Sequence, residues 1–63
     1  MLQDMKTTLA VDGMPKCDVH TAAAALEAAR RLNIENPGAK ITVYQWNNTH
    51  WYYDAATDSI EEA

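Results

Sequence analysis

The chain has 63 residues, one cysteine and a formal net charge of −4. This length allows one small domain with a thin core, spanning residues 1–63, because such a domain buries only about 60% of the surface that its unfolded chain exposes. A lone cysteine excludes an internal disulfide, and residues 1–10 lack the basic start and apolar run of a signal peptide, so a cytoplasmic, reducing location is expected. No stretch approaches the roughly 20 apolar residues that a membrane span needs.

The first predicted unit is a β-hairpin. Residues 6–11 alternate, with the bulkier apolar and β-branched side chains on one side, which is typical of a half-buried strand. Asp12 and Gly13 follow, and because both residue types tolerate positive φ, they predict a tight type I′ turn. Residues 14–17 then form the returning strand. This strand is expected at a sheet edge, since Pro15 has no N–H group to donate.

The second predicted unit is a helix from about Val19 to Asn33. Asp18 is its candidate N-cap, because a carboxylate there can accept the free N–H groups of the first turn. Cys17, beside this cap, is interpreted as a small buried apolar side chain. The helix ends before Asn-Pro-Gly at 36–38, since proline cannot continue a helix. One apolar stripe recurs at helical spacing, and it consists of Ala22, Ala25, Leu26, Ala29 and Leu32.

The C-terminal half predicts a meander of three strands. Residues 40–46 form a strand rich in β-branched and aromatic side chains, residues 47–49 a turn, and residues 51–54 the returning strand. Residues 54–60 predict a second tight hairpin, built on a type I turn followed by a left-handed residue.

Asp58 is an acceptable residue for that left-handed position. The strand after it, residues 59–62, is short and charged, and such charge discourages edge-to-edge aggregation. The element order β-β-α-β-β-β therefore predicts an α+β fold. We expect an antiparallel sheet of four to five strands with one helix packed on one face.

All five aromatic residues lie between positions 44 and 53. A three-residue turn at 47–49 would pair Val43 with Tyr53 and Gln45 with Trp51. In this preferred register the helix-facing side chains are Ile41, Val43, Trp51 and Tyr53. The opposite face then carries Tyr44, Trp46, His50 and Tyr52.

An even-length turn is the alternative register. It would pair Trp46 with Trp51 and Tyr44 with Tyr53, and it would place Tyr52 on the face of Ile41. A slip of one residue inverts every side chain of a strand, so the two registers bury different aromatic residues.

An exposed aromatic surface is a candidate partner-binding site. One helix covers only one face of a sheet, so Tyr44, Trp46, His50 and Tyr52 are expected to stand on the uncovered face. Exposed aromatic patches mark interaction surfaces, and tryptophan and tyrosine are enriched at binding hot spots. The other interpretation is that these side chains form cross-strand pairs that only stabilise the sheet.

The acidity of the chain is concentrated at its C-terminal end. Residues 1–53 contain five acidic and five basic residues, which cancel, whereas residues 54–63 contain no base. The four acids of that end are Asp54, Asp58, Glu61 and Glu62. They are candidates for steering onto a basic partner surface, or else they only keep the domain soluble. Nucleic-acid binding is disfavoured, because it needs clustered lysine and arginine.

Catalytic and metal-binding chemistry is poorly represented. Cys17 and His20 stand at C-x-x-H spacing and His50 is a second imidazole, but a structural zinc site usually needs four ligands. Cys17, His20 and Asp18 are sequence neighbours, whereas thiol-protease residues come from distant segments. The two glycines are turn residues, and no phosphate-binding loop occurs. We expect no metal, no cofactor and no enzymatic activity.

The helix followed by Lys40-Ile-Thr-Val-Tyr-Gln-Trp46 and Trp51-Tyr-Tyr-Asp54 resembles the layout of small phage-borne inhibitors of the anti-CRISPR type. The resemblance covers size, element order and acidity. It implies a short cytoplasmic protein that binds a host defence complex and blocks it sterically or by mimicking DNA charge. This chain departs from a strong DNA mimic in being less acidic.

The function expected first is therefore a non-enzymatic protein-binding module, with a homodimer left open. A second class is a single-stranded nucleic-acid binder that stacks bases on Tyr44, Trp46 and Tyr52. A third is the partner-binding domain of an antitoxin or small regulator.

Overall fold

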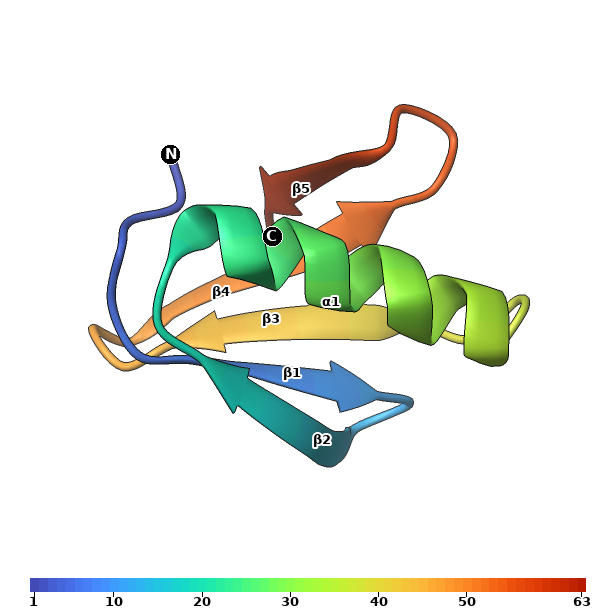
Figure 1. The fold of residues 1–63 in the computed structure, drawn as a ribbon, viewed down its shortest axis with the longest axis horizontal. Helices are drawn as coiled ribbons and strands as arrows, with labels where there is room; N and C mark the ends of the chain where they lie inside the picture. The colour runs from blue at the N-terminus through green and yellow to red at the C-terminus, as the bar shows by residue number, and fades with distance from the viewer.

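The computed structural model describes all 63 residues and contains one helix and five strands. Their order is β1 (Thr7–Val11), β2 (Met14–Val19), α1 (Ala22–Glu35), β3 (Ile41–Gln45), β4 (Thr49–Asp54) and β5 (Ser59–Glu62). The strands form one antiparallel sheet in the order β2-β1-β3-β4-β5, and α1 lies across one face of it (Figure 1). The predicted α+β fold is confirmed. The 14-residue α1 is too short to cross a membrane.

The first hairpin forms as its turn residues predict. Asp12 has φ 51° and Gly13 has φ 85°, so both occupy the left-handed region that a type I′ turn requires. The returning strand β2 is an edge strand, in agreement with the position of Pro15. It is longer than predicted, because pairing continues to Val19, opposite Thr7, past an irregularity between Leu9 and Ala10.

The predicted start of the helix is wrong. Asp18 belongs to β2, where its carboxylate accepts a hydrogen bond from the Thr8 hydroxyl at 2.7 Å. The N-cap is Thr21, whose Oγ1 accepts from the N–H of Ala24. Asp4 adds a second cap from outside the helix, since its carboxylate accepts from the N–H of Ala22 at 2.8 Å. Longer strand pairing and this double cap shift the helix by about one turn.

The predicted pairing of the aromatic hairpin is also wrong, although the predicted faces are right. Val43 pairs with Trp51 and Gln45 with Thr49, so the three-residue turn is 46–48. Asn48 supplies the left-handed residue of this turn, with φ 68°, a conformation that a β-branched Thr49 adopts poorly. The partners change by two residues, and because side chains alternate with a period of two, each side chain keeps its face.

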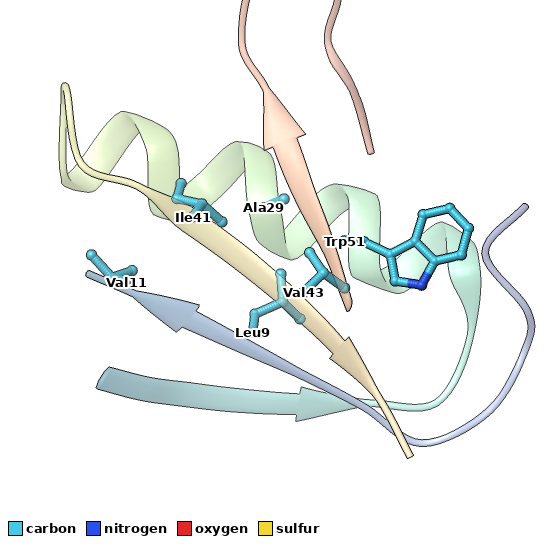
Figure 2. Packing of buried hydrophobic residues seen from close by; sticks show 6 residues of the cluster. All are labelled: Leu9, Val11, Ala29, Ile41, Val43 and Trp51. Carbon is cyan, nitrogen blue, oxygen red and sulfur yellow. The ribbon is translucent and has the colours of Figure 1, made fainter. Parts of the chain in front are cut away.

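The core lies between α1 and one face of the sheet (Figure 2). Ala25 and Ala29 are fully buried, and these small residues let the helix approach β1 and β3, with which it makes its main contacts. The buried side chains that meet it from the sheet are Leu9, Val11, Ile41, Val43 and Trp51. Cys17 is exposed on the outer strand, which corrects the expectation that it is buried.

Gln45 is a fully buried polar side chain on the helix-facing side of β3. Its Nε2 donates to the carbonyl of Gln3 at 2.7 Å and to Thr7 Oγ1 at 3.2 Å, and its Oε1 accepts from the N–H of Gln3. These bonds attach the segment before β1 to the sheet. No buried polar side-chain atom in the protein lacks a partner.

The β4–β5 hairpin is tied to the helix by Asp58. Its φ of 52° confirms the left-handed residue predicted at this turn. Arg30 of α1 donates to its carboxylate from Nε and Nη2, at 2.9 and 2.8 Å, and the Tyr53 hydroxyl donates at 2.7 Å. The hydrogen bonds from Arg30, followed by that from Tyr53, lower the pKa of Asp58 to about 2. The hydrogen bond to Asp58 also raises the pKa of Tyr53.

The Asp58 carboxylate is expected to make the free energy of unfolding depend on pH in the acidic range. Its folded pKa of about 2 lies below the usual 3.8, so its contribution to the free energy of unfolding is complete above about pH 4 and is lost as the pH falls through about 2. Asp58→Asn tolerates the same backbone conformation, removes the charge and replaces one of the two acceptor oxygens with an amide group that donates. Urea unfolding should show a constant stability difference between wild type and Asp58→Asn above pH 5, and that difference should narrow between pH 4 and 2. A difference independent of pH would contradict the role of the carboxylate charge.

Candidate functional site

The sheet face opposite α1 is not covered by any element and is here called the open face (Figure 1). The alternation of the strands places Tyr44, His50 and Tyr52 on it, as predicted. Trp46 lies in the turn after β3 and is also on this face, because its indole contacts Thr8 and Lys6. Trp46 is 56% exposed and Tyr52 is 39% exposed, so two large aromatic surfaces are presented to solvent.

Trp46 is held in place by contacts with Thr8 of β1 and with Lys6, which lies just before that strand. Its Nε1 donates to Thr8 Oγ1 at 3.1 Å, and Thr8 in turn donates to the Asp18 carboxylate at 2.7 Å. The Lys6 ammonium lies 4.3 Å from the centre of the indole ring, in a cation–π contact. The exposed indole is therefore ordered before any partner arrives.

Tyr44 links the other aromatic side chains of the open face. Its ring centre lies 6.2 Å from that of Trp46, in an edge-on arrangement, and 4.9 Å from the imidazole of His50. Its hydroxyl donates to the Asn48 side chain at 3.0 Å, which ties the ring to the turn. Tyr52 stands on the next strand, opposite Thr42. Tyr44, Trp46 and His50 therefore form one cluster of rings, and Tyr52 is the next residue of β4 on the same face.

The four predicted acidic residues do not gather on one face. Glu61 pairs with Tyr52 and Asp54 with Ser59, so both belong to the open face. Glu62 pairs with Trp51 and therefore projects from the helix side. Asp58 is engaged by Arg30 and Tyr53. Asp54 also supports the second turn, since its carboxylate accepts from the N–H of Ala56.

Three residues of the open face were missed by the sequence reasoning. Lys6, Thr8 and Asp18 come from the N-terminal hairpin, and they reach the aromatic residues only because β1 pairs with β3 in the middle of the sheet. The alternation of β1 signals that Thr8 points away from Leu9. No pattern of neighbouring residues in the sequence indicates which strand pairs with β1.

The histidine, cysteine and acidic side chains of the protein do not gather into a metal-binding cluster. No group of three or more histidine, cysteine, aspartate or glutamate side chains is placed to hold a metal ion. His50 packs on Tyr44, and Cys17 pairs with Leu9 on the other face of the sheet from Asp18. What the arrangement offers chemically is ordered aromatic surface bordered by the carboxylates of Asp54 and Glu61.

The open face is thus a surface of aromatic and acidic side chains on a sheet that is backed by one helix. Comparison of the chain with protein-family models, with curated proteins and with solved structures returned no match. The candidate site is therefore defined only by the positions and contacts of its own residues.

Proposed function

We propose that the protein is a non-enzymatic binding module that recognises a protein partner through the open face. The observation that carries this proposal is the pair of exposed aromatic side chains, Trp46 and Tyr52, on a sheet face that no element covers. Tryptophan and tyrosine are the residues whose truncation most often costs binding energy at protein interfaces. Around them lie Tyr44 and His50, which widen the apolar surface.

Preorganisation supports this proposal. The hydrogen bond of Trp46 to Thr8 and the ring contacts of Tyr44 fix these side chains in the free protein. A partner would therefore immobilise few rotatable groups on binding, and the conformational entropy lost on association is correspondingly small.

Charge supports a basic protein surface as the target. The open face carries the carboxylates of Asp18, Asp54 and Glu61, and the ammonium group of Lys6, which lies on the same face, is already stacked on Trp46. Carboxylates steer association with a basic surface, and they repel the phosphates of a nucleic acid. This arrangement favours protein over single-stranded nucleic acid, even though both could stack on the aromatic rings.

The resemblance to small phage-borne inhibitors adds a finer form of the proposal. In that form the partner is a host defence complex of the CRISPR type, and the open face occupies a basic surface on which the complex would otherwise bind nucleic acid. Size, element order and net acidity support it. Its residues would be Tyr44, Trp46, His50, Tyr52, Asp54 and Glu61.

The test uses matched variants in a capture experiment. Immobilised wild-type protein is incubated with a nuclease-treated bacterial lysate, in parallel with Trp46→Ala and Tyr52→Ala. The expected result is a retained protein whose affinity, once measured with the purified partner, falls about 30-fold or more in each variant, as for hot-spot aromatic residues. Ile34→Ala is the control, because Ile34 is 77% exposed on the helix, away from the open face.

Two results would contradict the proposal. One is a partner that binds Trp46→Ala and Tyr52→Ala as tightly as wild type while circular dichroism shows both variants folded. The other is retention from an untreated lysate that disappears after nuclease treatment, accompanied by quenching of the tryptophan fluorescence by a single-stranded oligonucleotide in wild type and not in Trp46→Ala. That second result would assign the open face to nucleic acid.

A further inference from the structure

The two edges of the sheet are not equivalent. At one edge, β2 contains Pro15, which lacks an N–H group, and its ladder is irregular between Leu9 and Ala10. Both features hinder the addition of another strand. At the other edge β5 has neither a proline nor an irregularity, and its pairing with β4 is regular from Ser59 to Glu62.

The outward-pointing backbone groups of β5 can be identified from the ladder. The N–H of Ala63 donates to the carbonyl of His50 at 3.1 Å, so Ala63 faces β4. Hydrogen-bonded pairs alternate in an antiparallel ladder, which directs the backbone of Ser59 and Glu61 toward β4 as well. The N–H and C=O groups of Ile60 and Glu62 therefore point away from the sheet.

A groove lies beside this edge, between β5, the first half of α1 and the N-terminal segment. Its volume is about 510 Å³. Its apolar wall is made of Met1, Leu2, Ala22, Leu26 and Ile60, and the carboxyl-bearing residues Asp4 and Asp58 border it. The groove exists because α1 packs mainly on β1 and β3, so the helix covers the β5 side of the sheet incompletely.

We infer that the β5 edge is a second docking surface, which shares only Glu61 with the border of the open face and takes an extended basic peptide segment as an additional antiparallel strand. The backbone of Ile60 and Glu62 would bind the segment through main-chain hydrogen bonds, and side chains on alternate positions would confer specificity. The residue of the bound segment that lies opposite Ile60 points to the helix side. This residue is expected to be apolar, because its side chain enters the groove. The residues of the segment that lie opposite Glu61 and Glu62 are expected to be lysine or arginine. The one opposite Glu61 projects from the open face, and the one opposite Glu62 projects from the helix side.

Charge complementarity selects this occupant over a second copy of the chain. Antiparallel pairing of β5 with β5 would place Glu61 opposite Glu61 in one register, Glu62 opposite Glu62 in another and Glu62 opposite Asp58 in a third, and like charges directly opposite one another destabilise a sheet. The same two glutamates attract a lysine-bearing strand. They thus disfavour self-association at the edge and favour a basic segment, and the apolar groove adds a preference for one hydrophobic side chain.

The test uses a synthetic peptide and the whole protein, with no partner of the open face present. The probe is the capped peptide Thr-Lys-Lys-Leu-Thr, which places its lysines opposite Glu62 and Glu61 and its leucine opposite Ile60. Nuclear magnetic resonance is expected to show saturable binding at micromolar to millimolar peptide. The amide hydrogens of Ile60 and Glu62, which point away from the sheet in the free protein, should become protected from exchange, whereas the protection of those of Thr8 and Tyr44 should not change.

Matched controls separate strand addition from simple attraction. The same peptide with N-methylated leucine keeps its charge but loses the hydrogen bond to β5, so its binding should be lost. Thr-Glu-Glu-Leu-Thr should not bind. The double variant Glu61→Lys/Glu62→Lys should weaken binding of the first peptide about tenfold at low salt, since each exposed charge pair contributes modestly.

Failure of this inference is recognisable without reference to the open face. Absence of binding at millimolar peptide would overturn it, as would binding that leaves Ile60 and Glu62 unprotected or tolerates the N-methyl group. None of these results bears on the Trp46 and Tyr52 variants, because the peptide experiment contains no partner for those side chains.

Discussion

Trp51→Ala is expected to destabilise the protein severely, by about 3–5 kcal/mol of unfolding free energy. Trp51 is only 6% exposed and packs with Val43 and Leu9 between the sheet and α1 (Figure 2). Truncating a buried tryptophan costs about 3–5 kcal/mol, because the cavity is only partly filled by relaxation. A chain of this length has a total stability of about 3–9 kcal/mol, so the loss removes a large share of it. Urea unfolding followed by far-ultraviolet circular dichroism measures the change.

Trp46→Ala is the matched control, since it removes the same side chain from the same hairpin on the opposite face. It deletes one hydrogen bond to Thr8, one contact with Lys6 and the edge-on ring contact with Tyr44, so the expected cost is about 1–2 kcal/mol. A folded Trp46→Ala protein is also what the binding experiment requires. Equal destabilisation by the two substitutions would contradict the assignment of faces on which the proposed function depends.

Gln45→Ala is expected to lower the free energy of unfolding by about 2–4 kcal/mol. The substitution leaves a cavity at a fully buried position and removes the partner of the Gln3 backbone and one partner of the Thr7 hydroxyl. The segment before β1 should detach, which hydrogen exchange at the Gln3 amide detects as a loss of protection.

Gln3→Ala is the control for Gln45→Ala. Gln45 bonds to the backbone of Gln3 and not to its exposed side chain, so Gln3→Ala should leave both the stability and the amide protection nearly unchanged. If Gln3→Ala were as costly as Gln45→Ala, a side-chain contact of Gln3 would be responsible, and the backbone tether would be refuted.

The two proposed surfaces follow from one feature of the packing. A single short helix seated over β1 and β3 leaves the whole opposite face free and also leaves the β5 side of its own face incompletely covered. The open face presents Trp46 and Tyr52 to solvent, and the incompletely covered side presents the edge strand β5 beside an apolar groove. The ion pair of Asp58 with Arg30 limits the width of this groove, because it ties the tip of the β4–β5 hairpin to α1.

The sequence by itself determined the element types, the two hairpin turns with left-handed residues, and the face on which each aromatic side chain stands. These features depend on local sterics and on a side-chain period of two, so even the wrong pairing of Val43 left Tyr44 and Tyr52 on the correct face.

Only the tertiary structure decided which strands are neighbours and which polar groups meet. The pairing of β1 with β3 brought Thr8 and Lys6 to Trp46, and it placed Gln45 over the segment that begins the chain. The helix start moved to Thr21 because Asp18 found a partner across the sheet in Thr8. Contacts between residues distant in the chain depend on how elements pack together, and no local pattern of residues encodes that arrangement.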